Sequence, residues 1–218
     1  MINTKGHISP WTAALLATLA AVLVLASAVG AEEKTVTIPA GSLEMLQDVF
    51  ARVADLLWEK SDDYFHEGYH ERCISVMRLV TEIDPTDVRA FAVGSWLIDS
   101  RGRDAEGIAF LERGLALNPD RYDLYAELGH RYFHMENYPK AAEYFQAAVN
   151  FKDCPVTLWH MLAHSYEKSG LLEKAVQTWE HSAVLEPDNP VVQRNLDRVK
   201  KQLAAHESQH PDNPPERR

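Results

Sequence analysis

Two pairs of histidines stand four residues apart, a spacing that suits metal binding. His160 and His164 lie in LWHMLAHSYEKSG, residues 158–170, and His130 and His134 lie in ELGHRYFHMEN. Residues at i and i+4 share one face of a helix, and imidazole is a ligand for zinc and copper. However, HMLAH lacks the Glu that a zinc hydrolase places beside its first ligand, and no third-ligand pattern follows. Three interpretations remain open: a four-histidine metal site, histidines that hydrogen-bond their neighbours, and histidines that line a binding surface.

The sequence contains no arrangement of residues typical of an enzyme. It has no phosphate-binding glycine loop, no nucleophile with a placed histidine and acid, and no converging pair of carboxylates. We therefore expect no catalytic residues and no cofactor. The net charge of -10, with no cluster of Lys and Arg, argues against a nucleic-acid partner. A protein or peptide partner fits this composition better.

The N-terminal residues are expected to lie outside the folded domain. An apolar run extends from Trp11 to Ala31 and ends at Glu32 and Glu33. About 20 apolar helical residues cross the hydrocarbon core of a bilayer. Small residues at the end of the run suit a signal peptidase, and the length of the run also suits a retained anchor. Residues 1–31 are therefore predicted to be a signal peptide or an N-terminal membrane anchor, with membrane contact through residues 11–30 if the segment is not cleaved.

The charges around this run predict its orientation. Lys5 precedes the run and acidic residues follow it, so the remaining chain should lie on the extracytoplasmic side of the membrane. If cleavage occurs near Ala31, the protein would be periplasmic or secreted. Residues 32–41 contain Pro and Gly as helix breakers and are predicted to be a linker.

The elements that position the histidines come from an internal repeat. Pro85 and Pro119 are 34 residues apart, and Pro187 follows after twice that interval. A period of this length is typical of a solenoid unit with two helices. The units cover residues 54–87, 88–121, 122–155 and 156–189.

Each unit also repeats two further kinds of residue in register. A small residue that lets two helices approach recurs at Cys73, Gly107, Ala141 and Ala175. A residue for a left-handed turn between helices recurs at Gly68, Gly102 and Gly170, with Glu136 in the third unit. Because glycine inside a helix costs roughly 0.5–1 kcal/mol relative to alanine, Gly107 and Gly114 predict that the second helix of the second unit is the loosest.

These recurring positions resemble the pattern of the tetratricopeptide repeat family. The resemblance is clearest in YAELGHRYFHMENYPKAAEYFQAAV and WHMLAHSYEKSGLLEKAVQTWEHSAVLEP. The resemblance covers residues 54–189 and implies an all-α fold, a right-handed superhelical solenoid of antiparallel helix pairs. The repeat domain is expected over residues 42–206, including a capping helix over 190–206, and residues 207–218 are expected to be a disordered tail. The predicted caps use apolar residues at helical spacing, namely Leu43, Leu46, Phe50, Val53 and Leu57 at one end and Val192, Leu196, Val199 and Leu203 at the other.

The resemblance also implies which residues meet a partner. In this family the first helix of each unit lines a concave groove, and the side chains expected there are Trp58, Asp62, Phe65, His66, Trp96, Asp99, Ala126, His130, Phe133, His134, His160 and His164. Exposed aromatic residues suit a groove that binds peptides. Trp159 and Trp179 instead fall in packing columns. The expected function is a non-enzymatic scaffold that binds a protein or peptide, and the alternatives are a metal-binding module that uses the histidines and a self-associating structural subunit.

Overall fold

The computed structural model describes residues 41–209, apart from the side chain of Leu43. The predicted signal or anchor segment, the linker up to residue 40 and the tail from residue 210 lie outside these described residues. Of the described residues, 47–209 belong to one compact unit. Within the described range every regular element is an α-helix, which confirms the predicted fold class.

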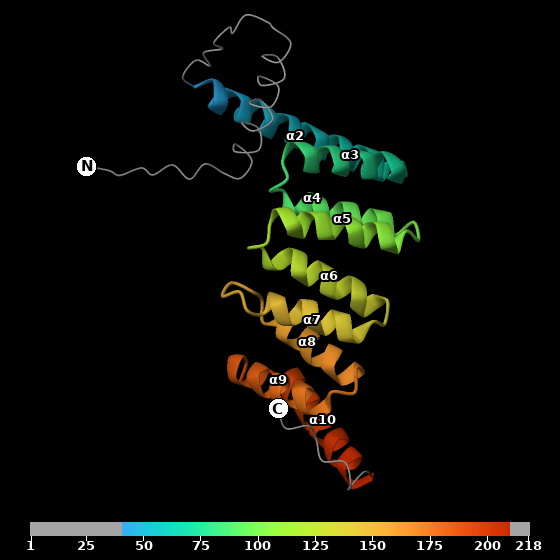
Figure 1. The fold of residues 1–218 in the computed structure, drawn as a ribbon, viewed down its shortest axis with the longest axis vertical. Coiled ribbons are helices and arrows are strands. Elements are labelled where there is room, and N and C mark those ends of the chain that lie inside the picture. The colour runs from blue at the N-terminus through green and yellow to red at the C-terminus, as the bar shows by residue number, and fades with distance from the viewer. Residues whose placement is uncertain (1–40, 210–218) are drawn as a thin grey trace, which may run out of the picture. The chain divides into compact units, whose positions relative to one another are not determined.

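The helices form consecutive antiparallel pairs. Their bounds are α2 Ser42–His66, α3 His70–Ile83, α4 Val88–Asp99, α5 Asp104–Leu117, α6 Tyr122–His134, α7 Tyr138–Ala148, α8 Thr157–Lys168, α9 Leu172–Leu185 and α10 Pro190–Gln209. From α3 onward each helix packs against the next one in the chain, as Figure 1 shows. The first helices α4 and α6 of consecutive pairs also touch each other.

The turns between paired helices adopt the left-handed conformation that the glycine column predicts. The φ angles are +78° at Gly68, +72° at Gly102 and +77° at Gly170, and Glu136 adopts +58° at the same place in the third pair. Amide-to-carbonyl bonds close three of these turns, for example from Leu171 N to Tyr166 O at 2.9 Å. This is the hydrogen-bond pattern of a Schellman motif, which satisfies the last carbonyls of the first helix.

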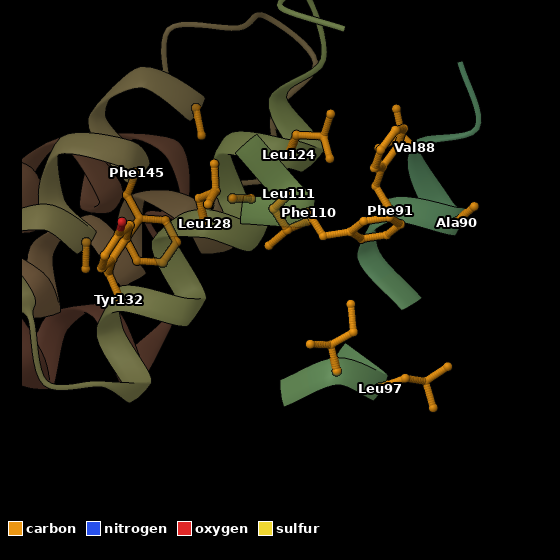
Figure 2. Packing of buried hydrophobic residues seen from close by; sticks show 14 of the residues in the cluster. Val88, Ala90, Phe91, Leu97, Phe110, Leu111, Leu124, Leu128, Tyr132 and Phe145 are labelled. Carbon is orange, nitrogen blue, oxygen red and sulfur yellow. The ribbon is translucent and has the colours of Figure 1, made fainter. Parts of the chain in front are cut away.

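The core runs continuously between the paired helices. Phe91 and Phe110 lie beside each other with ring centroids 5.2 Å apart, and Figure 2 shows them close to Leu111. The small residues that recur in each repeat are fully buried: the exposure is 0% at Cys73, Ala141 and Ala175. The two helices of a pair therefore approach closely at these positions.

Two glycines of the second pair are needed for packing. A Cβ atom on Gly114 would lie 2.7 Å from Phe91 Cγ, and one on Gly94 would lie 2.6 Å from Phe110 Cε1. Neither distance is compatible with an ordinary carbon–carbon contact. Helix propensity alone predicted a loose α5, but Gly114 also permits close packing of α5 against Phe91.

The two end helices differ in how well they are covered. Val192 and Val199 of α10 are fully buried and Leu196 is nearly so, as expected of a cap. In α2, by contrast, Phe50 remains 40% exposed and burial begins near Val53. Helix α2 has 25 residues and α3 has 14, and α3 contacts the C-terminal part of α2, where Cys73 Sγ donates a hydrogen bond to the Ser61 carbonyl at 3.4 Å.

Helix α10 also ends later than predicted. It continues to Gln209, whereas the sequence predicted a cap over 190–206 followed by a disordered tail. No helix breaker occurs before Pro211, and the Ser208 hydroxyl donates a hydrogen bond to the Ala204 carbonyl one turn earlier.

Candidate functional site

The candidate site is the surface formed by the first helices of the pairs, here called the first-helix surface. It consists of the predicted partner-contacting residues on α2, α4, α6 and α8. These side chains differ widely in exposure: Asp62, Phe65, His66, Trp96 and His134 are exposed, Trp58, Asp99, His130, Phe133, His160 and His164 are half-buried, and Ala126 is buried.

Phe65 and Trp96 form an aromatic pair that bridges α2 and α4. Their ring centroids are 6.0 Å apart, and the residues are 40% and 49% exposed. The His70 ring also contacts Phe65, with ring centroids 5.7 Å apart and the rings at a steep angle. Asp62 lies one turn earlier on α2, where its Oδ2 is 3.5 Å from His66 Nε2. This part of the surface therefore presents two large rings beside an exposed carboxylate.

Trp58 already has partners within the protein. Its indole Nε1 donates a hydrogen bond to Asp87 Oδ2 at 2.8 Å, and the Arg89 guanidinium lies 4.1 Å from its ring centroid. Asp87 also caps α4, because its Oδ1 accepts a hydrogen bond from Ala90 N. Trp58 is thus half-buried at the junction of α2 and α4 and has less free surface than Trp96.

Asp99 forms an ion pair with Arg131 of the next first helix. Burial and a hydrogen bond with Asp104 raise the pKa of Asp99 above its ordinary value, although the Arg131 charge acts in the opposite direction. The arrangement joins α4 to α6 and occupies the carboxylate that the sequence assigned to partner binding.

The middle of the surface is more closed than expected. Ala126 is only 8% exposed, so its side chain offers a partner far less surface than the sequence predicted. His130 packs edge-on against Phe145 with ring centroids 5.0 Å apart, and burial lowers the pKa of its imidazole. Phe133 packs against Tyr138 at 5.2 Å, whereas His134 at the end of α6 is exposed.

His160 and His164 enclose a core tryptophan. Trp179 is 1% exposed, which confirms its predicted packing role. The His160 ring stacks on it with centroids 5.3 Å apart, and the His164 ring meets it edge-on at 5.0 Å. The sequence placed both histidines on the surface as residues left over from packing, but each presents a ring face or edge to the core.

Carboxylates complete the surroundings of these two histidines. His160 Nε2 lies 3.1 Å from Glu186 Oε2, without the geometry of a hydrogen bond. His164 Nδ1 lies 3.6 Å from Glu167 Oε2, and the same carboxylate binds Arg198 of α10 through both of its oxygens. Burial lowers the pKa of His164, although the Glu167 charge partly opposes this shift.

The structure does not assemble the four histidines into a metal site. Within residues 41–209 no three His, Cys, Asp or Glu side chains converge in a way that could hold a metal ion. The reason is visible at each pair: His130 packs on Phe145, and both His160 and His164 pack on Trp179. Likewise, none of the helices in this range is both long and apolar enough to cross a membrane.

One polar feature has no counterpart among the predicted residues. Arg103 in the turn before α5 binds Glu106 Oε2 at 2.7 Å and Glu71 Oε2 at 2.9 Å, and Arg78 binds the same Glu106. These ion pairs join the second helices α3 and α5. The i, i+3 spacing of Arg103 and Glu106 is a weak signal for such a pair, but Glu71 lies 32 residues away and only the fold brings it close.

Comparison with known proteins identifies the architecture. The family described as tetratricopeptide repeat matches residues 156–189, the same residues as the fourth 34-residue unit. The fourth unit of this chain is therefore a tetratricopeptide repeat. Repeats of this kind typically serve as protein-interaction modules, because stacked units create an extended binding surface.

A curated relative and several solved structures are similar to this repeat protein. Protein bimA of Emericella nidulans is 28% identical over 101 residues, which are 46% of this chain and only 12% of that protein. The structure described as "MamA RS-1 ArsTM double mutant" has 16% identity and a TM-score of 0.58, covering 71% of this chain and 86% of that one. "MamA 41-end from Desulfovibrio magneticus RS-1" has 15% identity and a TM-score of 0.57, covering 71% and 88%. At this identity the structural likeness concerns the fold alone.

Proposed function

We propose that the protein is a non-enzymatic scaffold whose first-helix surface binds a protein or peptide partner in a groove lined by α2, α4, α6 and α8. The observation that carries this proposal is the exposed pair of Phe65 and Trp96, which bridges two repeats. Large aromatic side chains supply contact area at a low cost in rotamer entropy and dominate many binding surfaces. The repeat architecture supports the same function, since its usual role is protein interaction.

A photoreactive amino acid tests this proposal. It should be placed at His134 or Ser100, which are exposed near the C-terminal ends of α6 and α4, and in parallel at Leu79 or Leu117, which are exposed on the second helices. Ala126 is unsuitable because its side chain is buried. The expected result is one identified partner captured from the first-helix positions and not from Leu79 or Leu117. Capture from the second-helix positions alone would contradict the proposal.

We further propose that residues 1–31 export the chain or anchor it, so that the repeats lie on the extracytoplasmic side of a membrane. This rests on the apolar run from Trp11 to Ala31, with Lys5 before it and acidic residues after it. Mass spectrometry of the native N-terminus distinguishes cleavage near Ala31 from retention. Protease access to intact cells, compared with lysed cells, then tests on which side the repeats lie.

A further inference from the structure

The Phe65–Trp96 pair is a large apolar surface exposed within the first two repeats. Trp96 is 49% exposed and Phe65 is 40% exposed, although their rings approach each other to 6.0 Å. Within the described residues the Trp96 indole N–H makes no hydrogen bond. Single exposed apolar residues are common on protein surfaces, but two adjacent aromatic rings with a free indole donor are typical of a contact site.

The surroundings of this pair carry negative charge. Five acidic residues and one lysine occur from residue 55 to residue 67: Asp55, Glu59, Asp62, Asp63 and Glu67, with Lys60. Lys60 is engaged with Asp63 at 3.1 Å, Arg72 of α3 lies over the rings of Tyr64 and Tyr69, and Arg89 of α4 lies over Trp58. Asp62, with its side chain 75% exposed, meets only the imidazole of His66. The net potential beside the rings therefore favours a cation.

The same chain shows how such a cation would be held. At Trp58 a guanidinium lies 4.1 Å from the centroid of an indole ring, and the indole N–H donates to a carboxylate. A cation over an aromatic face gains from the ring quadrupole, most strongly for tryptophan, and a nearby carboxylate adds to this attraction. Trp96, Phe65 and Asp62 present the same chemical groups to solvent, and no cation of the described residues lies over the Trp96 ring.

We propose that Trp96, Phe65 and Asp62 form a binding site for a lysine or arginine side chain of the partner, so that the partner segment seated on the first two repeats is basic. This inference rests on the proposed function, since it specifies the chemistry of the partner at one end of the first-helix surface. The cation lies against the two rings and pairs with the Asp62 carboxylate, and the Trp96 N–H is available to a carbonyl of the partner backbone.

Selection from a phage-displayed library of random 12-residue peptides tests the inference with the full chain in mild detergent. Peptides that depend on Trp96 should be enriched in Lys or Arg beside an apolar residue. For a selected peptide, Trp96→Ala should weaken binding by about tenfold, and replacing the peptide's cation by glutamine should cost a similar factor. In the Trp96→Ala protein the glutamine replacement should have little further effect, because both changes remove one contact.

Matched variants separate this contact from general effects. Leu117→Ala removes an equally exposed side chain, 49%, from a second helix and should leave binding unchanged. Asp62→Asn should weaken binding and reduce its salt dependence, whereas Asp120→Asn, at an exposed turn, should do neither. Circular dichroism confirms that each variant is folded.

The outcomes distinguish failure of this inference from failure of the proposed function. If selected peptides depend on other first-helix residues such as Phe133 or His134 but show no excess of Lys or Arg, the inference is wrong and the scaffold function stands. If enriched peptides are acidic, or bind Trp96→Ala as well as the natural protein, the inference is also wrong. If the selection yields no peptide that depends on any residue of the first-helix surface, both are wrong.

Discussion

The imidazole of His164 meets the indole of Trp179 edge-on, with ring centroids 5.0 Å apart and ring planes at 81°. His160, one turn earlier on α8, stacks on the same indole. Through Glu167, which binds Arg198, the cluster also reaches the capping helix α10. Histidines that the sequence assigned to partner binding therefore contribute to the packing of the fourth repeat against the cap.

This packing predicts that stability falls in mildly acidic solution. Burial lowers the pKa of His164 and of His130 below the ordinary value of 6.5. The unfolded chain therefore binds protons at a higher pH than the folded protein. The stability that the two neutral imidazoles provide is complete above pH 6.5 and is lost as the pH falls through their lower folded values. Thermal unfolding should show a lower midpoint at about pH 5.5 than at about pH 7.5.

Substitution identifies the groups responsible for this pH dependence. A His130→Asn, His164→Asn double variant should show a flatter dependence between these pH values, whatever its absolute stability. Asp99 and Glu127 have raised pKa values, so their contribution to the pH dependence has the opposite sign, and it is the same in the natural protein and in the double variant. A double variant with an unchanged pH profile would contradict the assignment.

Glu136 should be replaceable by glycine with a gain in stability. It adopts a φ of +58° at a position where the other repeats have glycine. A side chain in the left-handed region costs roughly 1–2 kcal/mol, part of which is offset by the greater freedom of glycine in the unfolded chain. Glu136→Gly should therefore raise the free energy of unfolding by about 1 kcal/mol, measured by urea denaturation.

The same substitution inside a helix is the control for this prediction. Glu143 is exposed in α7 of the same repeat, and Glu143→Gly should lower stability by about 0.5–1 kcal/mol. Opposite signs for the two variants are expected. A loss of stability at both positions would show that the turn does not favour glycine.

Gly114→Ala should destabilise the protein, even though alanine is the better helix former. The new methyl carbon would lie 2.7 Å from Phe91 Cγ in the core. Overpacking of this kind typically costs about 1–3 kcal/mol, which exceeds the gain of about 1 kcal/mol in helix propensity. Denaturant unfolding should also show that Gly114→Ala costs less in a Phe91→Leu background. An equal cost in both backgrounds would exclude the ring contact as the cause.

Asp87→Ala should lower stability by removing two interactions at once. The Asp87 carboxylate caps α4 through Ala90 N and accepts the hydrogen bond of the Trp58 indole. Loss of a helix cap alone costs about 0.5–2 kcal/mol. Asp120→Ala, at an exposed turn, should change stability by less than about 0.5 kcal/mol. Chemical denaturation of both variants measures the difference, and equal stabilities would refute the dual role of Asp87.

Much of the architecture follows from local sequence signals. The left-handed turns at Gly68, Gly102 and Gly170 need only a residue without Cβ, and such a position is visible in the sequence. The buried small column and the buried Trp179 follow from the repeat register, since a 34-residue period places equivalent residues in equivalent environments. The end of α10 was less predictable, because the boundary of a capping helix depends on breakers and local hydrogen bonds rather than on the repeat.

The sequence did not predict which residues of the candidate site are exposed. Register alone places Trp58 and Trp96 on the same surface, but Asp87 and Arg89 engage Trp58 whereas Trp96 stays half exposed. Register likewise assigns Ala126 to the groove, although its side chain is buried. In both cases the outcome depends on side chains that other helices contribute.

The sequence by itself determined the repeat, the pairing of the helices and the face to which each residue belongs, because these depend on periodicity and turn chemistry within about 34 residues. Only the tertiary structure decided which residues of that face remain free for a partner. Contacts between helices, such as those of His160 and His164 with Trp179, arise from the angles and distances at which whole helices pack. The position of a residue within the repeat indicates the direction of its side chain but not which other side chains it contacts.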